Sequence, residues 1–292
     1  MNMRNQLSTL ETSPMNQFET VPLEAVRLYW DSRPCNIRHS AKPIGTRDYF
    51  DEVEARKYLV EPHIPVFADF ARWHGKCVLE IGCGIGTDTI NFARAGADVT
   101  AIDLSPRSLE LAQLRANEFA VSDRITFQCA NGEELSATVP IAAYDLVYSF
   151  GAIHHTPRPD RVLAELRRYL KPDGTLKLMV YHRYSWKVFW IALTAGPWRF
   201  ARIRQLIARY SEAQSGCPVT YTYTRGEARR LVESHGFRVV EMHVDHVFPY
   251  RIADYRDYRY VKEWYFRWMP EFLFQYFQRL FGWHLLITAE AK

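Results

Sequence analysis

The sequence lacks a long apolar run. Its longest apolar stretch, Val188 to Ala195 with one threonine inside, is far shorter than the roughly 20 residues that span a bilayer. The first twenty residues contain no continuous apolar segment of the kind that secretory signals carry. We therefore expect no integral membrane segment, and these features favour a cytoplasmic protein.

Cysteine is scarce and scattered. The five cysteines include no Cys-x-x-Cys pair and no combination with histidine at zinc-ligand spacing. Reduced and mostly buried thiols are the expected state, and the sequence predicts no metal site.

A strong charge of one sign is also missing. The net charge is only +4 over 292 residues, and clusters of Lys or Arg are interleaved with acids. Proteins that track phosphates usually gather their basic side chains on one face, so we expect no nucleic-acid partner.

The composition that remains is that of a folded globular protein, with 48% hydrophobic and 24% charged residues. The pattern of elements divides the chain into three parts. Residues 1–22 are predicted to form a flexible tail, residues 23–74 an N-terminal helical cap, and residues 75–292 one domain with helical insertions at about 184–220 and 244–282. Within the last part, strand-like segments alternate with helical ones, which is typical of right-handed βαβ units in a mostly parallel sheet.

The second insertion is unusually aromatic. From Val244 to His284, 15 of 41 residues are Phe, Tyr or Trp, against 14% in the whole chain. A segment of this composition must bury itself against something, and we expect a helical cover over one end of the sheet. A dimer interface would use the same residue types, and a peripheral membrane contact is a further alternative.

The most informative motif runs from Glu80 to Gly86, at the exit of the first predicted strand and the start of a helix. Its three glycines allow a tight turn and a close approach of backbone to ligand, and the helix start offers free amide donors. The third glycine comes one residue earlier than in the dinucleotide-binding fingerprint. A simple tight turn would not need three glycines together with an acid.

Asp103 ends the second predicted strand, about 20 residues after the glycine loop, where an acid can accept hydrogen bonds from ribose hydroxyls. The alternative role, a helix N-cap, is one that Ser105 provides equally well.

Taken together, the segments VLEIGCGIGTDT, VTAIDLSPRSLELA, YDLVYSFGAIHHTP and LKPDGTLKLMVY resemble the motifs of class I S-adenosylmethionine (SAM)-dependent methyltransferases. The IHHT element and the LKPDG turn are most similar to the small-molecule branch that includes ubiquinone and menaquinone biosynthesis enzymes. The resemblance implies an α/β fold with a Rossmann-like, doubly wound sheet, mostly parallel with an antiparallel last strand. It also implies SAM as the cofactor.

Carried over residue by residue, the resemblance assigns the cofactor contacts. Asp103 would hold the ribose, and Leu104 would pack beside the adenine. Asn131 stands where the family often has Asp, and its amide oxygen can accept a hydrogen bond as a carboxylate does. The full set of predicted cofactor-binding residues is Glu80, Gly82, Cys83, Gly84, Gly86, Asp103, Leu104, Asn131, Gly132, Glu133, Ser149 and Phe150.

Candidates for acid–base chemistry are His155, His182 and Tyr184. A histidine titrates near neutral pH and can remove a proton from an acceptor hydroxyl or thiol. His155 can equally serve to shape its loop, and for His154 we favour that structural role. His243 and His246, beside the aromatic insertion, are interpreted as surface or core-edge residues.

Two segments outside the sheet are expected to select the substrate, because they concentrate Arg, His and Tyr. The predicted substrate-binding residues are Arg38, His39, Tyr250, Arg251, Tyr255, Tyr258 and Arg259. The alternative is that the arginines pair with nearby acids, Asp245, Asp254 and Asp257, on a solvated face. Together, the loop of residues 33–46 and residues 244–282 would form a cover over the acceptor.

The sequence therefore favours methylation of a small molecule, with an anionic or aromatic group as a suitable acceptor. A non-catalytic SAM-fold scaffold is the first alternative, and a nicotinamide-dependent oxidoreductase, disfavoured by the glycine spacing, is the second. A homodimer is compatible with all three. The tetrapeptide from Ser149 to Ala152 does not match the Pro-Pro-Tyr type that accompanies amino-group methylation of bases or glutamine.

Overall fold

The structure, a computed structural model, describes residues 18–195, 203–210 and 216–292. Seven strands of this part form one sheet in the order β3-β2-β1-β4-β5-β7-β6. Strands β1 to β5 pair in parallel, whereas β7 is antiparallel to both β5 and β6. The expected doubly wound sheet with an antiparallel last strand is thus confirmed. The strands are β1 (Cys77–Ile81), β2 (Asp98–Asp103), β3 (Ile125–Cys129), β4 (Tyr144–Phe150), β5 (Leu170–Tyr181), β6 (Phe237–Asp245) and β7 (His284–Ala291).

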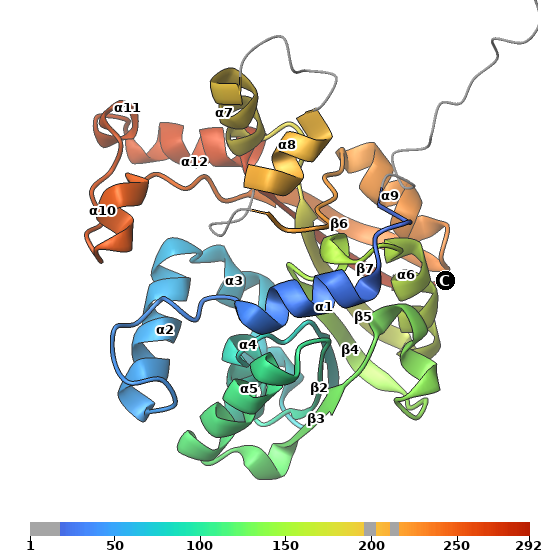
Figure 1. Cartoon of the computed structure of the whole chain (residues 1–292). Helices are drawn as coiled ribbons and strands as arrows, with labels where there is room; N and C mark the ends of the chain where they lie inside the picture. Colours follow the sequence, from blue (N-terminus) through green and yellow to red (C-terminus); the bar gives the residue numbers. More distant parts are fainter. Residues whose placement is uncertain (1–17, 196–202, 211–215) are drawn as a thin grey trace, which may run out of the picture.

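Helices connect the strands and cover the two faces of the sheet (Figure 1). The side chain of Ser105 caps α5 by accepting a hydrogen bond from the Ser108 amide at 3.0 Å. Thr224 and Glu227 form a reciprocal capping box at the start of α9. The connecting helices are α4 (Thr87–Arg94), α5 (Pro106–Glu118), α6 (Pro159–Tyr169) and α9 (Arg225–Glu233).

The predicted N-terminal cap consists of α1 (Leu23–Ser32), α2 (Arg47–Val60) and α3 (His63–Ala68). Helix α1 packs beside α5, where Asp31 accepts hydrogen bonds from the Ser105 hydroxyl and the Arg107 amide, each at 2.9 Å. Within the stretch predicted to be a tail, residues 1–17 lie outside the described residues. Phe18 is buried, and its ring packs edge-on against a tyrosine 4.9 Å away.

The two insertions contain short helices. In Figure 1 these lie above the cap helices, whereas α4 and α5 lie below them. A small apolar cluster of Val247, Phe266 and Phe274, with Trp186 packed against it, joins α11 and α12 to the start of α7. No helix of the described residues is long and apolar enough to cross a membrane. The inserted helices are α7 (Trp186–Ala195), α8 (Ile203–Tyr210), α10 (Ile252–Arg256), α11 (Trp264–Arg267) and α12 (Glu271–Phe281).

Candidate functional site

A cavity of about 340 Å³ lies at the carboxyl ends of the parallel strands. Ile81, Asp103, Phe150 and Tyr181, the last residues of β1, β2, β4 and β5, all line it. This is the edge at which open α/β sheets bind their ligands, because strand order reverses there and the loops diverge. Nine of the predicted site residues border the cavity: Gly82, Cys83, Gly84, Asp103, Leu104, Asn131, Gly132, Phe150 and His155.

The glycine loop forms one wall of the cavity. Gly82, Gly84 and Gly86 all have positive φ angles, +77°, +55° and +76°, a region that L side chains rarely adopt. The amide of Gly82 donates to the carbonyl of Ile102 at 2.7 Å, which ties the loop to the end of β2. The positive φ angles and this hydrogen bond set the path of the loop beside β2.

Asp103 links the glycine loop to the next turn. One carboxylate oxygen accepts from the Gly84 amide and the other from the Ser105 amide, both at 2.8 Å. Burial raises the pKa of Asp103, and the backbone donors act in the opposite direction. Because each carboxylate oxygen can accept two hydrogen bonds, Asp103 keeps capacity for a ligand's hydroxyl groups. Ser105, and not Asp103, caps the following helix.

Asn131 borders the cavity after β3. Its side-chain oxygen accepts from the Glu133 amide at 2.9 Å and so starts the 3-10 helix Gly132–Ala137. The carboxylate of Glu133 in turn accepts from the Arg158 amide at 2.8 Å. Asn131 is thus placed by its own turn beside Gly132, whereas Glu133 holds a neighbouring loop and does not line the cavity.

Three other predicted cofactor residues stand behind the cavity wall. Glu80 is buried, and the Thr89 hydroxyl donates to it at 2.6 Å; burial raises the pKa of Glu80 to about 8. Ser149 donates its hydroxyl to the carbonyl of Ile81 at 3.0 Å. Gly86 is the N-cap of α4, and an added Cβ there would come within 3.0 Å of Ala112. In this structure they support the residues that line the cavity.

His155 is the one acid–base candidate that borders the cavity. Its Nδ1 lies 2.8 Å from the carbonyl oxygen of Val219, which must accept, so Nδ1 carries the proton of the neutral ring. The Nε2 atom is then the basic nitrogen. Trp30 packs edge-on against the imidazole with ring centroids 5.1 Å apart, and this contact holds the ring's orientation. The adjacent His154 is fully buried, and burial lowers its pKa far below the usual value.

His182 and Tyr184 do not line the cavity. His182 follows β5 and lies 3.2 Å, through Nδ1, from the carbonyl of Gly282; burial lowers its pKa. Tyr184 is 67% exposed. Neither side chain is placed for contact with a molecule in the cavity.

The predicted substrate residues also lie outside the cavity wall, but several of them meet each other. Tyr255 and Tyr258 pack against the guanidinium of buried Arg56, at 4.0 and 4.3 Å from the ring centroids. The Tyr255 hydroxyl lies 3.3 Å from Nε2 of His39, and the Tyr258 hydroxyl donates to the carbonyl of Arg38 at 3.2 Å. The N-terminal loop and the aromatic insertion are therefore in direct contact.

The remaining three residues of that set have other surroundings. Arg259 forms ion pairs with Asp254 at 2.9 Å and Asp257 at 3.2 Å. This is the arrangement expected if the arginines pair with nearby acids on a solvated face instead of binding substrate. Tyr250 packs edge-on against a neighbouring tyrosine of the insertion, and Arg251 is the exposed N-cap of α10.

Among the residues that sequence reasoning missed at the cavity wall are five with Lys, Glu or His side chains: Lys57, Glu61, Lys187, His246 and His284. Lys57 forms a buried ion pair with Asp88 at 2.7 Å. His246 was interpreted as a surface or core-edge residue, yet it is only 8% exposed and faces the cavity. Burial lowers the pKa values of His246 and His284 well below the usual value, so both imidazoles are neutral at pH 7. The two histidines belong to no sequence motif, and a single lysine or glutamate on a predicted helix does not indicate a binding site.

Comparison with known proteins agrees with this geometry. Residues 78–174, about a third of the chain, match the family model described as "Methyltransferase domain". Over 138 residues, the chain is 33% identical to the ubiquinone biosynthesis O-methyltransferase of Chromobacterium violaceum, covering 46% of this chain and 58% of that protein. The chain spans between 25% and 58% of the length of the first curated relatives that it matches.

Solved structures share the fold over most of the chain. Geranyl diphosphate C-methyltransferase from Streptomyces coelicolor A3(2) has a TM-score of 0.59 at 15% identity, covering 96% of this chain and 100% of that one. Magnesium protoporphyrin IX methyltransferase from Synechocystis PCC 6803, with bound SAH, has a TM-score of 0.57 at 16% identity, covering 92% of this chain and 99% of that one.

Proposed function

We propose that this chain, whose residues 78–174 form a class I methyltransferase domain, binds SAM in the cavity and methylates a small-molecule acceptor there. One observation carries the proposal. The segment from Gly82 to Gly84, Asp103 and Asn131 lie at the carboxyl ends of three different strands, and all of them border one cavity. That arrangement suits a ligand with an adenosine at one end and a charged amino acid at the other.

In this proposal the adenosine part of SAM lies against β2 and β3. Asp103 accepts from the ribose hydroxyls, Leu104 packs on the adenine, and Asn131 with Gly132 borders the ring. The methionine part follows the loop from Gly82 to Gly84. When bound, SAM supplies the methyl group on a sulfonium, which needs a nucleophile in line with the breaking bond.

The rest of the cavity wall suits a planar acceptor. Trp30, Tyr181 and Trp283 border it, and the Lys187 ammonium lies 4.8 Å from the centroid of the Trp283 ring. His155 is proposed to take the acceptor's proton at Nε2, because its Nδ1 proton is held by the carbonyl of Val219. A flat acceptor with an ionisable hydroxyl, carboxyl or thiol group fits these surroundings.

The proposal is tested by calorimetry of the purified full chain with SAM and with NAD, followed by transfer of labelled methyl from SAM to a panel of phenols, carboxylic acids and thiols. SAM binding with methyl transfer to at least one of these classes is expected. SAM binding without transfer across the panel would favour the scaffold alternative, and binding of NAD in place of SAM would favour the oxidoreductase.

Asp103→Ala is expected to weaken SAM binding by about 1 to 3 kcal/mol, the usual cost of leaving buried hydrogen-bonding groups unpaired. The amides of Gly84 and Ser105 lose their shared acceptor as well, so the loop loses support. Calorimetry measures the change, with Asp98→Ala as the control, since Asp98 is an exposed residue at the far end of the same strand. Unchanged affinity in Asp103→Ala would remove this carboxylate from the binding site.

The loop of residues 33–46 and residues 244–282 are proposed to act as a joint cover. Cys35 and Asn36 of the loop line the cavity, and Tyr255 and Tyr258 of the insertion hold the loop's neighbouring residues. A cover excludes water from the reacting groups, and the opening of such covers commonly limits turnover.

Hydrogen exchange tests the cover. SAM together with an acceptor is expected to slow amide exchange in both segments, at a protein concentration where the oligomeric state does not change. Protection that follows protein concentration and ignores ligand would identify the insertion as a dimer interface instead.

A further inference from the structure

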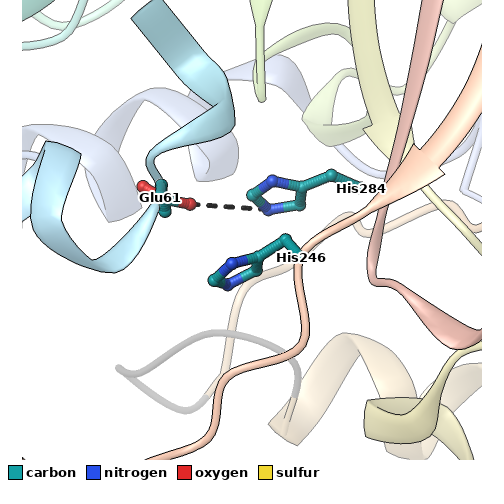
Figure 2. A group of neighbouring side chains, drawn as sticks. All are labelled: Glu61, His246 and His284. Atoms are coloured by element: carbon teal, nitrogen blue, oxygen red, sulfur yellow. Dashed lines mark ion pairs between the residues drawn. The ribbon is translucent and has the colours of Figure 1, made fainter. Parts of the chain in front are cut away.

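Three metal-ligating side chains converge on the cavity from distant parts of the chain. Glu61 is the C-cap of α2, His246 follows β6, and His284 opens β7. One candidate ligand atom from each lies within 4.8 Å of the other two. Figure 2 shows the carboxylate and the two imidazoles gathered together, although they come from three separate segments. All three side chains border the cavity.

The orientation of His284 is fixed by a fourth residue. Its Nδ1 lies 2.9 Å from Nε2 of His63, and its Nε2 lies 3.6 Å from a carboxylate oxygen of Glu61. When Nδ1 donates to His63, Nε2 presents its lone pair toward the carboxylate. Two electron-pair donors then face each other, at a separation close to the roughly 3.4 Å between two ligands of a tetrahedral ion with bonds of about 2.0 to 2.1 Å. A cation between them satisfies both.

His246 completes the group. Its ring stacks on that of His284 with centroids 4.5 Å apart and planes inclined by 26°. Its backbone is held in the left-handed region at φ +68°, and its carbonyl accepts from the Trp283 amide at 2.7 Å. The pairing of Asp245 with His284 puts the two histidines at the same end of adjacent strands. His246 therefore directly follows β6, and His284 begins the strand that pairs with it.

We propose that Glu61, His246 and His284 form a binding site for a divalent transition-metal ion such as Zn²⁺, Mn²⁺ or Fe²⁺. Two imidazoles and one carboxylate are a ligand set that holds such ions and leaves positions open for a further ligand. The site faces the cavity, so the open position is accessible to a molecule bound there. His63 serves as the outer partner that holds the tautomer of His284, as is usual for metal-ligating histidines. Ligand atoms as far apart as 4.8 Å must approach each other by up to about 1.4 Å when the ion binds, because bonds of about 2.0 to 2.1 Å place two ligands roughly 3.4 Å apart.

The use of this ion rests on the proposed methyltransferase function. An acceptor hydroxyl or thiol group that binds to the ion has a lowered pKa and is positioned for attack. Its oxygen or sulfur forms a bond to the methyl carbon while the bond from that carbon to the sulfonium sulfur breaks. The sulfonium sulfur keeps the electron pair, and the acceptor's proton passes to Nε2 of His155 or to water. No redox step is involved.

Cobalt(II) tests the site, because its visible absorption reports imidazole and carboxylate ligation without requiring SAM or an acceptor. Metal-free full-length protein is titrated with Co²⁺, and SAM affinity is measured separately by calorimetry. We expect one Co²⁺ per chain. His246→Ala, His284→Ala and Glu61→Gln are each expected to weaken Co²⁺ binding at least about 10-fold and to change the spectrum, and His63→Ala to weaken it about 10-fold.

His243→Ala is the matched control, since His243 lies on β6 close to His246 but has a 45% exposed side chain outside the cavity wall. It should bind Co²⁺ as the unchanged protein does. Protein that binds SAM but no Co²⁺ at millimolar concentration overturns the metal site. Co²⁺ binding that survives all three ligand substitutions also overturns it. Co²⁺ binding at these residues without SAM binding would instead refute the methyltransferase proposal.

Discussion

Gly84→Val is expected to lower the affinity for SAM about 100-fold or more, while the protein stays folded. This change in affinity corresponds to about 2.8 kcal/mol or more of binding free energy. A Cβ added at Gly84 meets no protein atom within 4 Å, so the branched side chain has room in the protein itself. The space that it occupies borders the cavity in which we place the cofactor. The φ angle of +55° adds a backbone strain of about 1 to 2 kcal/mol, which a domain of this size tolerates.

Gly75→Val is the matched control. Gly75 also has a positive φ, +67°, and also has open space around its Cβ position, but it does not line the cavity. It should therefore have the same strain and normal SAM affinity. Thermal unfolding and calorimetry on both variants separate strain from blocked binding. SAM affinity near that of the unchanged protein in Gly84→Val would contradict the placement of the cofactor along this loop.

Gly82→Ala should behave differently from both. Its Cβ would lie 2.1 Å from the Cβ of Ala152, a separation that no rearrangement of a side-chain end can relieve. The glycine loop and the turn after β4 would have to move apart, and we expect a clear loss of thermal stability along with the loss of binding.

The second large effect is expected for Lys57→Met, which should lower the free energy of unfolding by about 3 to 5 kcal/mol. Lys57 pairs with Asp88 at 2.7 Å, and the side chain of Asp88 is only 3% exposed. The hydroxyls of Tyr58 and Tyr148 also donate to Asp88, at 2.9 and 3.0 Å. Without the lysine, the carboxylate remains buried with hydroxyl donors alone, and no cation balances its charge.

The pH dependence of this effect follows from the pKa of Lys57. Burial is the largest single influence and opposes the charge of Lys57, but the attraction and hydrogen bond of Asp88, together with Glu61 and Glu80, outweigh burial, so the pKa of Lys57 is raised. The ion pair's contribution to the free energy of unfolding is fully present below the pKa of lysine in the unfolded chain, about 10.4. It is lost only as the pH rises through the higher pKa of Lys57 in the folded protein. The titration of Lys57 itself should therefore not change the difference between the two proteins from about pH 6 to pH 9.

Urea denaturation measures the loss, and Lys76→Met is the control. Lys76 faces Asp145 at 3.8 Å with a 55% exposed side chain, so its removal should cost less than about 1 kcal/mol. The double substitution Lys57→Met with Asp88→Asn should recover part of the loss, because it removes the uncompensated charge. Equal destabilisation by Lys57→Met and Lys76→Met would show that the buried pair has no special role.

The sequence by itself determined the local features of the cofactor side. The glycine loop, Asp103 and the cap at Ser105 each follow from a few adjacent residues, because a strand end, a tight turn and a helix start are decided by neighbours in the chain. Parallel pairing brings such strand ends to one edge, and Asp103 borders the cavity there. Asn131, which only the family resemblance assigned to the cofactor, borders it too.

Only the tertiary structure decided which other polar side chains border the cavity beside the glycine loop and Asp103. Glu61 and His284 are separated by 223 positions, yet they lie 3.6 Å apart because β7 inserts between β5 and β6 and the cap packs over its end. The same packing leaves Tyr184 exposed and turns Tyr255 and Tyr258 toward Arg56 instead of the cavity. The sequence shows which residues precede and follow a given side chain. The direction in which that side chain points depends on distant segments of the chain that pack against it.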